Sequence, residues 1–292
     1  MAQHPFEMLD LDRELTTDQR MIRDVVAQFG REHIASNLRE WFEKESLPAR
    51  ELARELGSLG LLGMHLEGYD CAGTDATSYG LACLELEALD SGIRSLVSVQ
   101  GSLAMYAIHA FGTEAQKSEW LPAMARGEKI GCFGLTEADF GSNPSGMRTA
   151  ARQDGSDWIL NGTKFWITNG TLADVAIIWA QTDAGIHGFL VPTNTPGFSA
   201  RLIEHKLSLR ASHTAELVLD NEGIRGTRSK TLERAAQGLI HIAGPLEMNP
   251  TPLELKTIWP YVVQNSTGYT RTDAMQDVTL VKDFGTTANI KI

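Results

Sequence analysis

The sequence has few cysteines, no long apolar run and no segment that resembles a targeting signal, and each absence excludes a class of protein. Its three cysteines lack the spacing of metal ligands, so we predict no metal site. We interpret Cys71, Cys83 and Cys132 as reduced, buried residues of an intracellular protein. No apolar run approaches the roughly 20 residues that a membrane span requires.

The first residues, "MAQHPFEMLDLDREL", are acidic and poor in arginine. This pattern is typical of neither a signal peptide nor a transit peptide. We therefore expect a cytoplasmic protein of a bacterium, or a processed protein of the mitochondrial matrix if the source is eukaryotic.

Basic residues are scarce relative to acidic ones. The sequence has 26 Lys and Arg against 37 Asp and Glu, which gives a formal net charge of -11 at pH 7. Phosphate backbones are bound by clustered Lys and Arg, and the sequence contains no basic run. We therefore expect no nucleic-acid partner.

Apolar residues recur at helical spacing through residues 1–130, which predicts an all-helical N-terminal domain. Thr16 or Thr17 is a candidate N-cap of the first helix, and Pro48 suits the first turn of the second. The stretch 93–112 is apolar on nearly every side, so we expect one buried helix there. The predicted helices span residues 15–34, 48–63, 75–90, 93–112 and 113–128.

Beyond residue 130 the apolar period changes to two, and turns containing Gly, Asn, Asp and Pro separate short segments. Short strands at this spacing predict a small antiparallel β-barrel or sandwich, with a hairpin turn at 154–158. The predicted strands span residues 129–135, 148–154, 158–170, 174–183, 188–193, 199–205 and 214–220.

The predicted fold class is therefore α+β with several domains. A helical domain at 1–130 precedes a β domain at 131–220 and an unassigned C-terminal segment at 221–292. Within that segment, residues 229–244 could form one helix, and residues 277–292 have an extended pattern.

Two segments of the β domain are candidates for a binding site. The loop in "GCFGLTEADFGSNPSG", residues 131–146, is rich in Gly and Ser. Its backbone N–H groups could cradle a phosphate or a ring edge, or the glycines could simply turn the chain. In "TKFWITNG", residues 163–170, Trp166 and Thr168 share one face of a strand. They could bind a planar cofactor, or Trp166 could fill the core.

Arg94 lies in an otherwise apolar helix, where a charged side chain is costly unless it meets an opposite charge. Its planar guanidinium could bind the carboxylate of a ligand. Alternatively, it could form a surface ion pair with Asp90, four residues earlier in the same helix.

The order and spacing of three segments make residues 10–220 resemble the acyl-CoA dehydrogenase family, and within it the glutaryl-CoA dehydrogenases. These segments are "SGIRSLVSVQGSLAMYAIHAFGTEAQKSEWLPAMARGEKIGCFGLTEADFGSNPSGM", "LNGTKFWITNG" and "LSLRASHTAELVLD".

The resemblance implies that FAD binds along the loop after "FGLTE" and along the "WIT" strand, with the Thr168 hydroxyl near the flavin N5. The implied cofactor-binding residues are Phe133, Gly134, Leu135, Thr136, Gly141, Ser142, Trp166, Ile167 and Thr168. Where the family often has proline and serine after the glutamate of this loop, the sequence reads Ala138, Asp139 and Phe140.

The resemblance also implies a substrate site. Arg94 would hold the distal carboxylate of a dicarboxylyl-CoA, with Glu87 and Ser95 nearby and Ser142 beside the substrate chain. The implied reaction is α,β-dehydrogenation and decarboxylation of glutaryl-CoA to crotonyl-CoA, a step of lysine and tryptophan degradation. Electrons would pass to electron-transfer flavoprotein, and a complete family member is expected to be a homo-oligomer.

The family's catalytic glutamate belongs to a C-terminal four-helix domain of about 100 residues. The resemblance ends near Asp220, and the shorter remaining segment contains four prolines, so we expect the helical bundle to be absent or replaced. Glu233, Glu247 and Glu254 have no recognisable context, which leaves the catalytic base unassigned. Two interpretations stay open: an enzyme of this type with an altered C-terminus, or a catalytically incomplete chain that binds flavin, acyl-CoA or a complete subunit.

Overall fold

The first α-helix of the described chain is α2 (Thr17–Phe29), and its N-cap is Thr16, one of the two predicted candidates. Thr16 Oγ1 accepts a hydrogen bond from the Gln19 N–H at 3.2 Å, and the Gln19 side chain returns a bond to the Thr16 N–H at 3.0 Å. This capping box satisfies backbone groups that the first helical turn leaves unpaired.

The computed structural model describes residues 11–155, 157–220 and 227–228, together with the strand residues 269–271, 277–281 and 287–291. The chain divides into two units, Met1–Gly238 and Leu239–Ile292. The predicted helix at 229–244 lies outside the described residues, as do Glu233, Glu247 and Glu254.

Each predicted helix corresponds to described helices, but α3 (Leu38–Glu43) and the short η1 (Leu11–Glu14) were not predicted, and two details differ. Pro48 occupies the N-cap position before α4 rather than a place in its first turn, and the predicted helix at 93–112 is divided into three. The helices after α2 are η2 (Gly30–Ile34), α3 (Leu38–Glu43), α4 (Ala49–Ser58), α5 (Ala76–Leu89), α6 (Ser91–Ser98), η3 (Val99–Met105), α7 (Tyr106–Phe111) and α8 (Glu114–Ala125); the short η1 (Leu11–Glu14) precedes α2.

The interruption at η3 is a π-helical segment, in which the chain winds more loosely than in an α-helix. Buried Gln100 lies in this segment. Its amide donates to the carbonyl oxygens of Met124 (3.1 Å) and Lys129 (2.8 Å) and accepts from the Gly131 N–H (2.8 Å). The side chains of Leu103 and Tyr106 are 39% and 48% exposed, so this helical stretch is not buried on every side as predicted.

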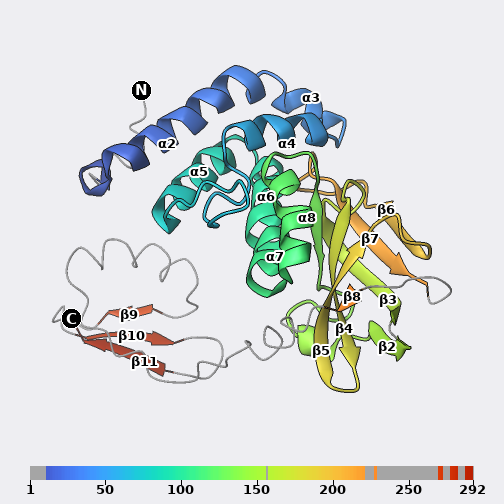
Figure 1. The fold of residues 1–292 in the computed structure, drawn as a ribbon. Helices are drawn as coiled ribbons and strands as arrows, with labels where there is room; N and C mark the ends of the chain where they lie inside the picture. The colour runs from blue at the N-terminus through green and yellow to red at the C-terminus, as the bar shows by residue number, and fades with distance from the viewer. Residues whose placement is uncertain are drawn as a thin grey trace. The chain divides into compact units, whose positions relative to one another are not determined.

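The β domain is a curled sheet in the order β6-β7-β3-β2-β4-β5-β8, with β1 paired to β4 (Figure 1). The prediction of a wholly antiparallel sheet is wrong at β1, which runs parallel to β4 with Gly131 opposite Val175. A long connection, not a hairpin, joins these two strands, and this permits parallel pairing. The strands are β1 (Gly131–Gly134), β2 (Ala150–Asp154), β3 (Asp157–Thr168), β4 (Val175–Thr182), β5 (Gly185–Pro192), β6 (Phe198–Leu202), β7 (Thr214–Leu219) and β8 (Thr227–Arg228).

Strand β4 is buried on both faces, which explains its continuous apolar run. Val175, Ile177 and Trp179 belong to the large core shared with the helices. The alternate residues Ala176 and Ile178 belong to a second core inside the curled sheet. The helical and β parts of the first unit therefore share one hydrophobic core, while the predicted boundary at 130/131 stays a prediction.

The second unit contains a three-stranded antiparallel sheet in the order β11-β10-β9. Its strands are β9 (Tyr269–Arg271), β10 (Asp277–Val281) and β11 (Thr287–Lys291), so the predicted extended stretch at 277–292 contains two of them. Among the helices of the described residues, none combines the length and the hydropathy that a bilayer span requires.

Candidate functional site

Trp166 is an exposed side chain at an irregular point of β3. Its side chain is 55% exposed, so the alternative interpretation that it fills the core is wrong. The pairing of β3 with β7 shifts register between Lys164 and Ile167, which marks a β-bulge. Within the bulge, the backbone of Trp166 has φ of 61°, a region that non-glycine residues rarely occupy.

The small-residue loop lies beside this bulge. The Phe165 N–H donates to the carbonyl oxygen of Thr136 at 2.8 Å, which joins the strand to the loop. Gly141, Ser142 and Trp166 are exposed, whereas Phe133, Leu135, Thr136 and Thr168 are half-buried. Gly134 and Ile167 are buried, so the Ile167 side chain packs into the sheet and leaves mainly its backbone for a ligand.

Phe140, the bulky departure from the family pattern, packs within its own loop. A Cβ atom on Gly146 would lie 2.5 Å from the Phe140 ring, so the ring fills the space above that glycine. The Arg148 guanidinium lies 5.5 Å from the centre of the same ring. A backbone bridge between Glu137 and Phe140 closes the turn.

Sequence reasoning missed a buried ion pair that joins the loop to β3. Lys164 Nζ lies 2.9 Å from Glu137 Oε1. Burial by itself would raise the pKa of Glu137, but hydrogen bonds from Arg148, Thr149 and Lys164 outweigh it and lower that pKa to about 2. Burial lowers the pKa of Lys164, and Glu137 opposes this change. The sequence signal for this pair was that Lys164 shares a face of the predicted strand at 158–170 with the apolar Leu160, where a charged side chain needs a partner.

Arg94 forms an ion pair with Glu87, and not with Asp90 as one interpretation had it. Arg94 Nε donates to Glu87 Oε2 at 2.6 Å, and Nη1 donates to Ser98 Oγ at 3.0 Å. The Asp90 carboxylate instead accepts from the Gly92 N–H at the start of α6. In the part of the chain that the structure describes, the remaining Nη2 group of Arg94 has no hydrogen-bond partner.

The partners of Arg94 come from two adjacent helices. The Ser91 hydroxyl donates to Glu87 Oε1 at 2.5 Å, and this bond, followed by Arg94, lowers the pKa of the Glu87 carboxyl. Arg94 and Ser98 are four residues apart within α6, whereas Glu87 belongs to α5 and Ser91 begins α6 after the extended Asp90. Ser95, which the family resemblance places near the substrate, is buried, and no described contact joins Ser142 to Arg94.

Two residues of α5, Tyr79 and Cys83, lie near the Arg94 guanidinium. Burial raises the pKa of the Tyr79 hydroxyl to about 12, and the same hydroxyl accepts a hydrogen bond from Ser102 Oγ at 2.6 Å. Burial also raises the pKa of the Cys83 thiol, with Arg94 opposing that change. Both groups are therefore neutral at pH 7, which leaves Arg94 and Glu87 as the charges of this cluster.

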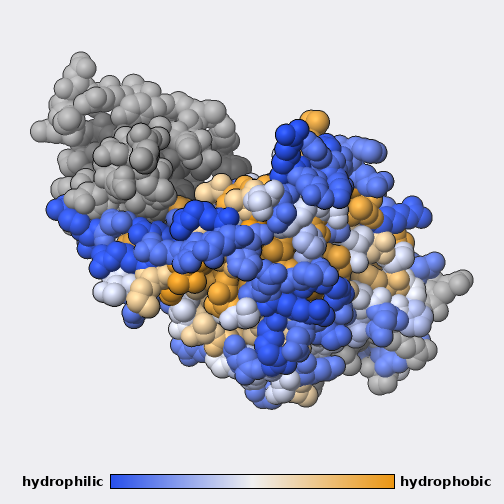
Figure 2. Space-filling model, turned by 90° about the horizontal axis from the view of Figure 1, so that it is seen from above, coloured by the Kyte–Doolittle hydropathy of each residue, from blue (hydrophilic) through white to orange (hydrophobic). Residues whose placement is uncertain are grey.

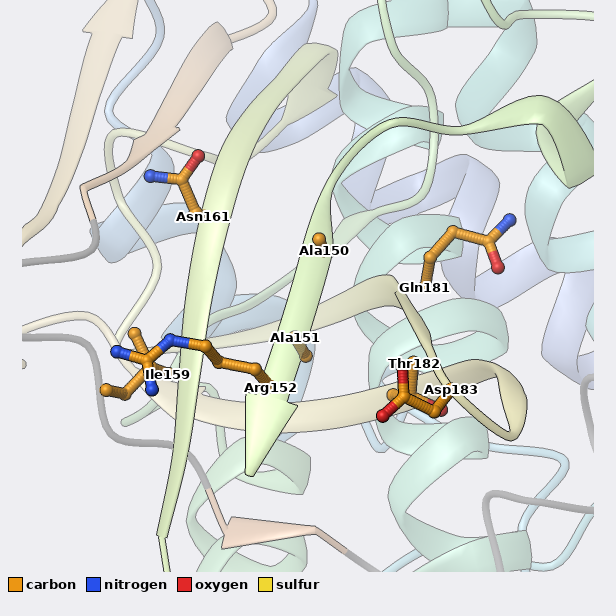
Figure 3. A pocket seen from close by; sticks show the side chains of 8 residues that line it. All are labelled: Ala150, Ala151, Arg152, Ile159, Asn161, Gln181, Thr182 and Asp183. Atoms are coloured by element: carbon orange, nitrogen blue, oxygen red, sulfur yellow. The ribbon is translucent and has the colours of Figure 1, made fainter. Parts of the chain in front are cut away.

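A groove of about 420 Å³ opens where β2 leaves β4 after their single parallel contact at Ala150 and Gln181 (Figure 3). Gln181 Nε2 donates to the Ser145 carbonyl oxygen at 3.1 Å, so the groove adjoins the small-residue loop. Its lining includes the guanidinium of Arg152 and the carboxylate of Asp183, whose opposite charges favour no single class of ligand. Within the residues that the structure describes, no group of three or more His, Cys, Asp or Glu could hold a metal ion.

Two family models match the chain. Residues 16–128 match the acyl-CoA dehydrogenase N-terminal domain, and residues 132–222 match the acyl-CoA dehydrogenase middle domain. The chain is 39% identical over 213 residues to an acyl-CoA dehydrogenase of Bacillus subtilis, covering 71% of this chain and 56% of that protein. It is 36% identical over 214 residues to the mitochondrial short-chain specific acyl-CoA dehydrogenase of Rattus norvegicus, covering 71% of this chain and 52% of that protein.

A solved structure is also similar. It is described as a glutaryl-CoA dehydrogenase from Mycobacterium smegmatis in complex with FADH2, and it aligns with a TM-score of 0.77 at 63% identity. The alignment covers 79% of this chain and 60% of the other. The chain therefore spans between half and two thirds of the length of the relatives it matches.

Proposed function

Because the chain belongs to the acyl-CoA dehydrogenase family, we propose that it binds FAD and oxidises an acyl-CoA thioester between Cα and Cβ. The observation that carries this proposal is the exposed Trp166 indole on its bulge, beside a loop of small residues. An exposed aromatic plane next to hydroxyl and backbone N–H groups suits a planar cofactor with a diphosphate.

The residues present fit FAD. Trp166 would lie along the ring system, and the half-buried Thr168 hydroxyl would hydrogen-bond to its edge. Exposed Gly141 and Ser142 would meet the diphosphate, and Phe140 packs on Gly146. When bound, FAD supplies the acceptor for the hydride that leaves the substrate, while the protein contributes stacking and hydrogen bonds.

We propose a short dicarboxylyl thioester, glutaryl-CoA, as the substrate. The Arg94 guanidinium would hold the distal carboxylate through its Nη2 group, with Glu87 fixing the orientation of Arg94 from the other side. The 63% identity to the glutaryl-CoA dehydrogenase structure supports this choice, whereas the rat relative is named for short-chain substrates. The substrate would lose a proton from Cα and a hydride from Cβ. Its distal carboxylate would then leave as carbon dioxide, and the carbanion that remains at the γ carbon would take up a proton to give crotonyl-CoA.

The other features of the proposed enzyme come from the family resemblance. We propose electron-transfer flavoprotein as the electron acceptor and a homo-oligomer as the assembly. The predicted cellular location stays a prediction, and the relatives include both a bacterial and a mitochondrial protein. The catalytic base stays unassigned.

Cofactor binding is tested on the purified full chain. We expect the purified protein to show a flavin absorption band, either as it is isolated or after the apoprotein is incubated with FAD and the excess FAD is removed. A folded protein that takes up no FAD under either condition would overturn the proposal.

Substrate choice is tested with Arg94→Ala. Because this change removes the donor for a distal carboxylate, we expect binding of glutaryl-CoA to weaken by roughly 10- to 100-fold while binding of butyryl-CoA changes little. Arg39→Ala is the matched control, since Arg39 also pairs with a glutamate on a helix but is 90% exposed. Equal losses for the two thioesters would exclude a dicarboxylyl substrate.

A second function, binding without turnover, is favoured by one observation. Large apolar side chains remain exposed on the described helices, including Met21, Val25 and Leu84. Figure 2 shows hydrophobic patches between hydrophilic ones on the face that it draws. Such surface is typical of a face that meets another protein segment. If the chain is incomplete, flavin will bind without reduction by any acyl-CoA, and size-exclusion chromatography will show concentration-dependent association.

A further inference from the structure

Two residues before Trp166, the chain buries an ion pair that the proposed reaction does not use. The side chain of Lys164 is 0% exposed and that of Glu137 is 8% exposed. At this burial neither group can touch a substrate or a cofactor, so neither is a catalytic residue. A buried pair is costly to form, since both charges lose their water. A structural or positioning role is therefore required to explain it.

The pair is fully hydrogen-bonded, and its bonds reach both ends of the small-residue loop. Glu137 accepts from the N–H groups of Arg148 (2.7 Å) and Thr149 (2.9 Å) and from Thr149 Oγ1 (2.6 Å). Lys164 also donates to the Leu135 carbonyl oxygen at 3.2 Å. Because residues 135–137 open the loop and residues 148–149 close it, the pair fixes the loop at its base.

The same pair adjoins the bulge that exposes Trp166. The register of β3 against β7 is regular up to Lys164 and shifts immediately after it. The next residue, Phe165, bonds to the carbonyl of Thr136, the residue before Glu137. A bulky residue at positive φ persists only where its surroundings hold it there. The ion pair, the bond from Lys164 to the Leu135 carbonyl and the bond from the Phe165 N–H hold this part of β3 against the loop.

We infer that Glu137 and Lys164 are positioning residues that set the distance between the small-residue loop and the Trp166 indole. The pair thereby sets the width of the slot for a planar ring, and this inference rests on the proposed FAD site. A pair with a structural role alone would change the free energy of unfolding and leave the bulge and its affinity for a ring unchanged.

The test uses the full chain with both charges removed, as Glu137→Gln combined with Lys164→Met. Removing one partner would leave an unpaired buried charge, whereas replacing both is better tolerated. Two properties are measured: the acrylamide quenching of Trp166 in the apoprotein and the Kd for FAD. The signal of Trp166 is isolated by comparison with a Trp166→Phe derivative of each protein, since the chain has six tryptophans.

We expect a cooperatively unfolding double variant in which quenching of Trp166 changes and FAD binds at least about tenfold more weakly. Thr193→Val is the matched control. It removes a hydrogen bond to the Ala173 carbonyl elsewhere in the β domain, so it should lower stability and leave both readouts unchanged. A folded double variant with unchanged quenching and a Kd within twofold of the wild type would overturn the inference.

If the double variant does not fold, the test uses Thr149→Val. This change removes the side-chain hydrogen bond from Thr149 to Glu137 and leaves the charges of Glu137 and Lys164 paired. Trp166 quenching and the Kd for FAD are then compared with the wild type by the same criteria. If the wild type binds no FAD, the proposed function fails by itself, and Trp166 quenching in the apoprotein still decides whether the pair positions the bulge.

Discussion

At the scale of single residues, Glu137 shows how a carboxylate can be kept ionised inside a protein. Its burial opposes ionisation, but three protein groups from the loop end and one from β3 donate to it. Its pKa is lowered to about 2 from a reference value of 4.5. A carboxylate whose pKa is lower in the folded state stabilises the fold above its unfolded pKa and loses that contribution as the pH falls.

We therefore expect acid to weaken the wild type more than a Glu137→Gln variant. The stability that Glu137 contributes is present above about pH 4.5 and is lost as the pH falls towards 2, by a total on the order of 3 kcal/mol. Urea unfolding at steps between pH 6 and 3 measures the difference in free energy of unfolding between the two proteins. A difference that stays constant across this range would contradict the assignment.

At the scale of elements, β3 combines a regular strand with a strained bulge. Residues 157–164 pair regularly with β2 and β7, whereas Trp166 has φ of 61°. A side chain in this region costs roughly 1–2 kcal/mol relative to glycine, because its Cβ approaches the following carbonyl oxygen. Strain at an exposed aromatic residue is in keeping with the proposed role of Trp166 in binding FAD.

This strain predicts an inverted order of stability for two substitutions. In an ordinary strand alanine is more stable than glycine, but at position 166 we expect Trp166→Gly to be more stable than Trp166→Ala by about 1 kcal/mol. Both should weaken FAD binding, since both remove the stacking surface. Chemical denaturation of the two apoproteins measures the order. Alanine being the more stable of the two would show that the bulge relaxes.

Local chemistry made much of this architecture predictable. The Thr16 and Thr113 caps and the alternation in β7 follow from patterns that neighbouring residues set. The sequence could not reveal the parallel pairing of β1, the bulge at Trp166 or the partner of Lys164, since each depends on residues distant along the chain. The apolar surroundings of Arg94 in the sequence predict that it meets an anion, either of a ligand or of Asp90. That Glu87 pairs with it depends on the path of the chain between α5 and α6.

At the scale of the whole molecule, the helical and β parts of the first unit are joined by polar contacts as well as by a common core. Gln100 on η3 binds the Gly131 N–H of β1. Asp174, just before β4, accepts from the Ile130 N–H at 2.9 Å and from Arg50 of α4 at 3.3 Å. Because these bonds cross the predicted domain boundary, the two parts should unfold together.

This coupling is testable with Gln100→Ala. The change leaves a buried N–H and two carbonyl groups without a partner, so we expect a loss of about 2 kcal/mol or more. Hydrogen exchange followed by mass spectrometry should show protection falling by the same amount in peptides from α8 and from β4. Gln28→Ala, at an exposed side-chain hydrogen bond, is the control. Loss of protection confined to the helical peptides would show that the parts unfold separately.

The loose winding of η3 bears on how the chain tolerates changes in its length. A π-helical turn accommodates an additional residue within a helix, so the residues after it are rotated about the axis relative to an uninterrupted α-helix. If one residue of this stretch is deleted, the π-helical turn can become an α-helical turn and the residues after it keep their positions. A deletion within α5 would instead rotate every later residue of that helix about its axis. We therefore expect a one-residue deletion that keeps Gln100 to be tolerated better within η3 than within α5.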